Sequence, residues 1–186
     1  MFWSLFVLVR GSIILEKNII LIGFMGAGKT TIGKLLAEKL NRKFIDIDEE
    51  IEKDFAMPVS EIFNKMGEKT FREKEKSLII RLCEQKKKII SLGGGAFLQE
   101  EIRNVCLTSS IVIFLDISWE SWEDRISLII NTRPVLQGKT IVEMEELFYQ
   151  RQEIYSHHHF KVKTDNLDIE EIANTIVKIV KTGELK

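Results

Sequence analysis

Short apolar runs alternate along the chain with longer stretches in which apolar residues recur every three or four positions. The short runs are typical of buried parallel strands, and the longer stretches are typical of amphipathic helices. Strands that alternate with helices form a parallel sheet covered by helices. The pattern predicts strands over residues Ile19–Ile22, Phe44–Asp46, Lys88–Ser91, Ile111–Leu115 and Lys161–Thr164.

The helical spacing defines the segments between these strands. Pro58 separates the second helix from the third, because a proline disfavours helical geometry at the residue before it. Ser60 is then a plausible N-cap, and Gly67 is expected to divide the third helix into two. The predicted helices cover Lys29–Leu40, Glu49–Phe55, Ser60–Glu84, Glu100–Val105, Trp119–Ile129, Ile141–His157 and Ile169–Lys181.

The loop between the first strand and the first helix carries the clearest chemical signal. Residues 23–30 read Gly-Phe-Met-Gly-Ala-Gly-Lys-Thr and fit the phosphate-binding pattern G-x-x-x-x-G-K-[ST]. Glycines let backbone N–H groups point inward, and the helix N-terminus adds partial positive charge. In such a loop Lys29 reaches the β- and γ-phosphates, and the Thr30 hydroxyl binds Mg²⁺. The alternative, a glycine-rich turn without a ligand, is disfavoured by the strand–loop–helix context.

Two aspartates, Asp46 and Asp48, come at the carboxyl end of the second predicted strand. Residues two apart on a strand project to one side, and ligands of open α/β sheets bind at this end. One carboxylate could hold Mg²⁺ through water, and the other could orient or deprotonate an acceptor hydroxyl. The alternative is that both cap the following helix.

The third strand ends in a second small polar stretch. Ser91 is placed to help hold water on Mg²⁺, and Gly93–Gly95 follow it directly. A run of glycines after a strand allows close approach of the backbone to a ligand. A plain tight turn is the alternative interpretation.

Three arginines stand out from the other basic residues. Arg72 shares a predicted helix face with Glu75, which would fix its guanidinium for a planar carboxylate ligand. A solvated helix face is the alternative for this pair. Arg133 lies in a polar, proline-marked stretch that resembles a mobile lid, where it could stabilise charge on the γ-phosphate. Arg151 and Tyr155 are four residues apart on one helix face and form a second possible carboxylate clamp.

Composition restricts the class of protein. The 186 residues are 45% hydrophobic and 30% charged, which indicates one soluble domain with a sizeable core. The 27 Lys and Arg against 28 Asp and Glu argue against a general binder of nucleic acid or acidic membranes. Cys83 and Cys106 lack metal-type spacing and are expected to be buried in a protein of a reducing cytoplasm. His157–His159 are interpreted as helix-end residues, because adjacent helical side chains point in different directions.

Residues 1–15 are strongly apolar, with a polar interruption at Arg10–Ser12. The segment is too short to span a bilayer as a helix, and it lacks the pattern of a secretory signal. We therefore expect residues 1–16 to be an extension outside the main fold and residues 17–186 to form a single domain. An interfacial membrane anchor is the alternative.

Several of these motifs occur together in the order and spacing of one enzyme family. They are the phosphate loop, Asp46-x-Asp48, Phe71-Arg72-x-x-Glu75, Gly93–Gly95, Arg133-Pro134 and Arg151-x-x-x-Tyr155. From about residue 17 to 181 the chain resembles the shikimate kinase family. The resemblance implies an α/β fold of the P-loop NTPase type, in three α/β/α layers around a five-stranded parallel sheet of order 2-3-1-4-5. It also implies a helical substrate-binding insert over about residues 47–84 and a lid over about residues 129–140.

The resemblance implies ATP-dependent phosphorylation of the 3-hydroxyl of shikimate, a step of aromatic amino-acid biosynthesis. Lys29, Asp48 and Arg133 would be catalytic. ATP would be bound by Gly26, Ala27, Gly28, Lys29, Thr30, Thr31, Arg133 and Arg125, the last stacked on adenine. Thr30 would bind Mg²⁺ directly, and Asp46 and Ser91 would do so through water. Shikimate would be held by Asp48, Arg72, Gly94, Gly95 and Arg151, against an apolar wall of Val59, Phe63 and Phe71.

The expected ligands are therefore ATP, shikimate and the cofactor Mg²⁺. We expect a cytoplasmic monomer without a nucleic-acid or membrane partner. Another small-molecule kinase, such as a gluconate kinase, is one alternative, and the set of Arg72, Gly93–Gly95 and Arg151 argues against it. A nucleotide-binding module that transfers nothing is the other, and Lys29 with the two aspartates argues against that.

Overall fold

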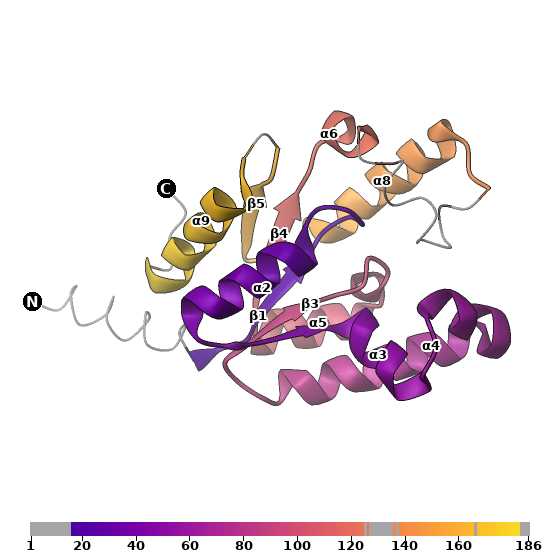
Figure 1. The fold of residues 1–186 in the computed structure, drawn as a ribbon, viewed down its shortest axis with the longest axis horizontal. Helices are drawn as coiled ribbons and strands as arrows, with labels where there is room; N and C mark the ends of the chain where they lie inside the picture. Colours follow the sequence, from indigo (N-terminus) through magenta and orange to yellow (C-terminus); the bar gives the residue numbers. More distant parts are fainter. Residues whose placement is uncertain (1–15, 125, 127–135, 137, 166, 183–186) are drawn as a thin grey trace, which may run out of the picture.

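The computed structural model describes residues 16–124, 126, 136, 138–165 and 167–182. This part of the chain holds a five-stranded parallel sheet of order β2-β3-β1-β4-β5, which confirms the predicted topology (Figure 1). Every residue of β1 is buried, as expected for a central strand covered on both faces. The strands are β1 (Ile19–Ile22), β2 (Lys43–Asp46), β3 (Lys88–Ser91), β4 (Ile111–Asp116) and β5 (Phe160–Lys163).

Helices cover both faces of this sheet. On one face α2 packs against α9, and on the other α4 packs against α5 (Figure 1). Right-handed crossovers between parallel strands produce this division. The helices are α2 (Lys29–Leu40), α3 (Ile47–Phe55), α4 (Val59–Cys83), α5 (Glu100–Ser109), α6 (Trp119–Glu123), α8 (Ile141–Tyr155) and α9 (Ile169–Thr182), with a short 3₁₀ helix, η1 (Ala96–Leu98), that the sequence analysis did not predict.

The strand register assembles one end of the sheet. Ser91 of β3 lies opposite Leu21 of β1 on one side and opposite Asp46 of β2 on the other. The carboxyl ends of these three strands are therefore neighbours. This arrangement places the loop after β1, the aspartates after β2 and the glycines after β3 around one space.

The start of α3 differs from the prediction. The helix begins at Ile47, so Asp48 lies in its first turn and not on the strand. The reason is that the Asp46 carboxylate caps the helix, accepting from the backbone N–H of Asp48 at 3.1 Å and of Glu49 at 3.5 Å. The capping interpretation is thus correct for Asp46.

The start of α4 also differs. Its N-cap is Pro58, so the prediction of Ser60 as the cap is wrong. The backbone N–H of Val59 instead donates to the Glu52 carboxylate at 2.8 Å, so a side chain of α3 satisfies the first turn of α4. Gly67 does interrupt the helix, with φ 82° and ψ 156°, as predicted.

Other boundaries shift by a few residues. The helix predicted to reach His157 ends at Tyr155, and α6 ends at Glu123. Residues 1–15 of the predicted extension, which was expected to cover residues 1–16, and most of the lid, residues 129–135 and 137, lie outside the described residues. No helix in the described ranges is long and apolar enough to cross a membrane.

Close packing of α2 on β2 gives a stability prediction. Alanine is normally about 0.5–1 kcal/mol better than glycine inside a helix. At Gly33, however, a Cβ would lie 2.3 Å from Phe44 Cε2 and 3.3 Å from Leu21 Cδ1. We therefore expect Gly33→Ala to lower the free energy of unfolding by about 1–3 kcal/mol, measured by urea denaturation.

The control is the same substitution in a Phe44→Leu background, where the clashing ring atom is absent. There the loss caused by Gly33→Ala should shrink. An equal loss in both backgrounds would rule out a collision with Phe44 as the cause.

Candidate active site

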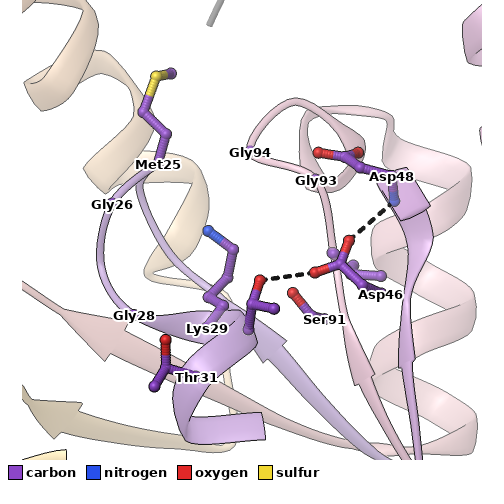
Figure 2. A pocket seen from close by; sticks show the side chains of 12 residues that line it. Met25, Gly26, Gly28, Lys29, Thr31, Asp46, Asp48, Ser91, Gly93 and Gly94 are labelled. Carbon is purple, nitrogen blue, oxygen red and sulfur yellow. Dashed lines mark hydrogen bonds between the residues drawn. The ribbon is translucent and has the colours of Figure 1, made fainter. Parts of the chain in front are cut away.

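The loop between β1 and α2 forms the floor of the first pocket (Figure 2). Gly26 and Gly28 have φ of 81° and 86°, which glycine adopts without strain and which curl the backbone. Gly28 is the N-cap of α2 and contributes no side chain, so the N-terminus of α2 opens toward the pocket. The Lys29 ammonium donates to the backbone carbonyls of Gly23 at 2.8 Å and Phe24 at 3.0 Å. These features suit the binding of a phosphate group.

Three oxygen-bearing side chains meet beside this loop. The Thr30 hydroxyl donates to Asp46 Oδ2 at 2.7 Å, while Asp46 Oδ1 caps α3. Ser91 lies next to Asp46 in the sheet register and lines the same pocket. A carboxylate and two hydroxyls are hard oxygen donors of the type that Mg²⁺ takes. The donor set therefore fits Mg²⁺.

A second pocket of about 250 Å³ adjoins the first. Asp48, Gly93, Gly94 and Met25 line both pockets, so the two pockets share part of their walls. All the residues predicted to bind the acceptor come together here. Its lining residues are Met25, Asp48, Val59, Phe63, Glu68, Phe71, Arg72, Glu75, Gly93, Gly94, Gly95 and Arg151.

The glycine run after β3 makes room for the polar side chains of this pocket. None of the three glycines has a positive φ, so the backbone conformation does not require them. A Cβ at residue 93 would lie 2.6 Å from Asp48 Oδ1, and one at residue 94 would lie 3.1 Å from Arg151 Nη1. A Cβ at residue 95 would lie 2.5 Å from Arg72 Nη2. Each glycine thus accommodates a different polar side chain of the pocket.

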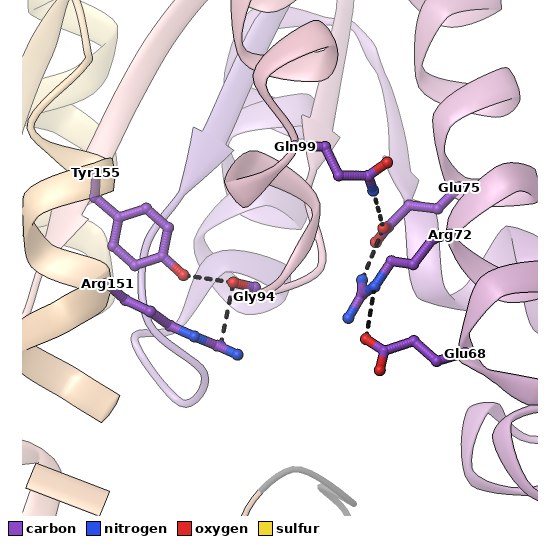
Figure 3. Close-up of polar contacts among 7 residues, drawn as sticks. All are labelled: Glu68, Arg72, Glu75, Gly94, Gln99, Arg151 and Tyr155. Carbon is purple, nitrogen blue, oxygen red and sulfur yellow. Dashed lines mark hydrogen bonds and ion pairs between the residues drawn. The ribbon is translucent and has the colours of Figure 1, made fainter. Parts of the chain in front are cut away.

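Arg72 is held by two carboxylates of its own helix (Figure 3). Its Nη1 donates to Glu75 at 2.8 Å, which confirms the predicted pair, and its Nε donates to Glu68 at 3.1 Å. The guanidinium also lies over the rings of Phe63 and Phe71. These contacts fix its planar group at the pocket wall.

Glu75 is fully buried behind Arg72. Its Oε2 accepts from Arg72 and from Gln99 Nε2 at 3.0 Å, whereas its Oε1 has no partner among the described residues. Burial raises the pKa of Glu75 to about 7, although the Arg72 charge partly opposes this effect. Glu75 therefore changes charge near neutral pH.

Arg151 approaches the pocket from α8 (Figure 3). Its Nη1 and the Tyr155 hydroxyl both donate to the Gly94 carbonyl, at 3.2 and 2.7 Å. Burial lowers the pKa of the Arg151 guanidinium and raises the pKa of Tyr155 to about 12. Figure 3 shows Arg72 and Arg151 pointing toward one another from α4 and α8. Two guanidinium groups on facing walls suit a carboxylate ligand.

Three of the predicted ATP-binding residues either do not line the first pocket or lie outside the described residues. Ala27 is not among the residues that line the first pocket, and its N–H donates to the Phe24 carbonyl at 3.2 Å within the loop, so its role in binding ATP stays a prediction. Arg125 and Arg133 lie outside the described residues.

Within the described ranges, no group of three or more His, Cys, Asp or Glu is placed to hold a metal. Cys83 and Cys106 are buried free thiols, as expected.

Two polar residues of the site were missed from the sequence. Glu68 stands four residues before Arg72 on the same helix, so its spacing carried a usable signal. Gln99 lies 24 residues from Glu75 in the chain, and no local pattern links them.

Comparison with known proteins agrees with this geometry. The family model described as "Shikimate kinase" matches residues 25–181. The shikimate kinase of Oceanobacillus iheyensis is 58% identical over 166 residues, covering 89% of this chain and 91% of that protein. The shikimate kinase of Bacillus subtilis is 57% identical over 169 residues, covering 90% of this chain and 91% of that protein.

Among solved structures, the chain is similar to the shikimate kinase from Acinetobacter baumannii in complex with shikimate. That match has a TM-score of 0.84 and 33% identity, and it covers 91% of this chain and 96% of the other. The residues that the family model matches include Lys29, both aspartates and the two arginines of the second pocket. The chain belongs to the shikimate kinase family.

Proposed function

We propose that this protein transfers the γ-phosphoryl group of ATP to the 3-hydroxyl of shikimate, giving shikimate 3-phosphate. The observation that carries the proposal is the position of Asp48. Its side chain borders both the phosphate-loop pocket and the pocket that holds the two guanidinium groups. A carboxylate at this junction can align a hydroxyl of one ligand with a phosphate of the other.

We propose that the first pocket binds the phosphates of ATP. Gly26, Gly28 and Thr31 line it, and Ala27 belongs to the same loop. Lys29 donates to two loop carbonyls in this structure, and its ammonium would exchange these dipoles for the charged β- and γ-phosphates. The phosphate oxygens carry net negative charge whereas the carbonyls are only dipoles, so Coulomb attraction favours this exchange.

We propose that Mg²⁺ binds between this loop and β2. Thr30 would bind it directly, and Asp46 and Ser91 would bind it through water. When bound, Mg²⁺ offsets the negative charge of the β- and γ-phosphate oxygens. The Thr30 hydroxyl donates to one oxygen of the Asp46 carboxylate, and the backbone N–H of Asp48 donates to the other. These two bonds preorganise the carboxylate for this role.

We propose that shikimate occupies the second pocket with its carboxylate between Arg72 and Arg151, near the backbone of Gly94 and Gly95. Val59, Phe63 and Phe71 would contact its ring. Asp48 would then accept a hydrogen bond from the 3-hydroxyl and take its proton as the oxygen attacks the γ-phosphorus, while the bond from that phosphorus to the β–γ bridging oxygen breaks and ADP leaves. Most of the acceleration comes from positioning and charge, because phosphoryl transfer asks for little covalent work by the protein.

Roles for Arg125 on adenine and for Arg133 on the γ-phosphate stay predictions. The same holds for a monomeric state, a cytoplasmic location, and the absence of membrane and nucleic-acid partners.

The function is tested by ATP consumption with shikimate, with gluconate and without an acceptor. Only shikimate should stimulate turnover. Lys29→Met should lower kcat by about 100-fold or more, because it removes the cation that offsets charge on the transferring group. Stimulation by gluconate, or full activity of Lys29→Met, would contradict the assignment.

The carboxylate clamp gives a second prediction. Arg72→Ala and Arg151→Ala should each raise the KM for shikimate about tenfold or more, since each removes a charge-assisted hydrogen bond worth about 1.5–3 kcal/mol. Arg81→Ala is the matched control, because Arg81 is an exposed arginine of the same α4 helix outside both pockets. A KM for shikimate that is unchanged in both clamp variants would remove the clamp from the proposal.

Glu75 gives a prediction on pH. Its pKa is raised from 4.5 in the unfolded chain to about 7 in the folded protein, so the folded state binds more protons between these values. A rise in pH lowers the free energy of unfolding wherever the folded state binds more protons than the unfolded state. The free energy of unfolding should therefore fall between pH 4.5 and about 7 in the wild type, relative to Glu75→Gln. Urea denaturation across this range measures it, and a pH-independent difference between the two proteins would refute it.

A further inference from the structure

We propose that Trp122 is a positioning residue for ATP binding. Its indole N–H fixes the peptide group between Met25 and Gly26 and so aims the Gly26 N–H into the phosphate pocket. The inference rests on the proposed function, since it assigns that N–H to the nucleotide.

Trp122 reaches the phosphate loop from a distant part of the chain. Its Nε1 donates to the Met25 carbonyl at 2.7 Å in a buried contact between residues 97 positions apart. The side chain is fully buried, and it lines neither of the two pockets. Trp122 therefore acts on the site indirectly, through the loop carbonyl that it holds and through Phe148 of α8, against which it packs at 6.2 Å between ring centroids.

Peptide geometry carries this contact into the pocket. The C=O of Met25 and the N–H of Gly26 belong to one planar peptide group, and in a trans peptide these two bonds point in opposite directions. Because the carbonyl points toward the Trp122 indole, the Gly26 N–H points away from it. Gly26 lines the phosphate pocket, and no hydrogen bond joins its N–H to another described residue. Within the described part of the chain, no other acceptor competes with a ligand for this N–H.

This peptide group needs an external partner to hold its direction. Gly26 has φ 81°, and glycine adopts positive and negative φ with similar ease. The peptide before a glycine can therefore rotate at low energetic cost. The Trp122 bond selects one orientation, because rotation would leave the buried Met25 carbonyl without its donor.

Aromatic packing holds the indole itself in place. The Trp122 ring meets Phe24 edge-on at 5.1 Å between ring centroids, and Phe24 meets Phe148 of α8 at 5.0 Å. The Arg151 guanidinium lies over the Phe24 ring, 5.6 Å from the ring centroid. Ring packing on Phe24 and the N–H bond to Met25 thus fix two successive loop residues.

Trp119 supplies a matched control on the same helix. It packs against Trp122 at 5.1 Å and against Phe148 at 5.6 Å, so it shares the aromatic cluster. No hydrogen bond of its indole N–H is found among the described residues, and the donor to the Met25 carbonyl is Trp122. A Trp→Phe change at residue 119 removes ring area, whereas the same change at residue 122 also removes the donor.

The experiment compares the wild type, Trp122→Phe and Trp119→Phe by steady-state kinetics and by calorimetric titration with ADP. Trp122→Phe should raise the KM for ATP and the Kd for ADP about tenfold, as expected for a lost hydrogen bond to a buried group. Trp119→Phe should change both values less than about twofold. Calorimetric stoichiometry separates affinity from the folded fraction, because unfolded protein lowers the stoichiometry and leaves Kd unchanged. Equal effects of the two variants would overturn the proposal.

A second variant isolates the N–H group and covers the case in which Trp122→Phe fails to fold. Trp122 is replaced by 3-benzothienylalanine, in which sulfur stands in place of the indole N–H. The ring size is kept and only the donor is lost. A raised Kd for ADP supports the proposal, and a wild-type Kd overturns it. If the wild type binds ADP but consumes no ATP with shikimate, the proposed function fails while this test still stands.

Discussion

The hydrogen bond from Thr30 to Asp46 joins the two halves of the site. Thr30 lies in the first turn of α2 on the phosphate side, and Asp46 ends β2 and caps α3 on the acceptor side. In the sheet, Ser91 of β3 lies between β1 and β2. The bond therefore lies where the loops after these three strands converge. Asp48 follows in the first turn of α3, so its position is fixed by the same carboxylate. The geometry of the nucleotide pocket and that of the acceptor pocket are therefore not independent.

Burial then sets the charge of the acceptor pocket. Two guanidinium groups face it, but Glu68 and Glu75 accompany Arg72. A buried ion pair loses hydration on both sides, and an ionised Glu75 would also weaken the attraction of Arg72 for an anionic ligand. The fully buried position of Glu75 favours its neutral form up to about pH 7. The pocket thus gains positive character by suppressing a negative charge as well as by placing cations.

Local patterns predicted most of the site, and tertiary contacts explain what they missed. The phosphate loop, the Arg72–Glu75 pair and the Arg151–Tyr155 pair depend on residues close in sequence, and all three are in place. The predicted helix start at Glu49 was wrong, because the Asp46 cap starts α3 two residues earlier and places Asp48 in its first turn. The contact from Trp122 to Met25 spans 97 residues and has no periodic signature, so only the fold could reveal it.

The glycine run after β3 has a consequence for how this pocket can change over evolution. Positions 93, 94 and 95 each face a side chain from a different helix, namely Asp48 of α3, Arg151 of α8 and Arg72 of α4. Three adjacent positions are therefore constrained by three separate helices of the chain. A lineage that shortened the residue at 72 would release position 95 to vary, while 93 and 94 would remain restricted. Covariation across this motif should thus split residue by residue, although the three glycines are contiguous.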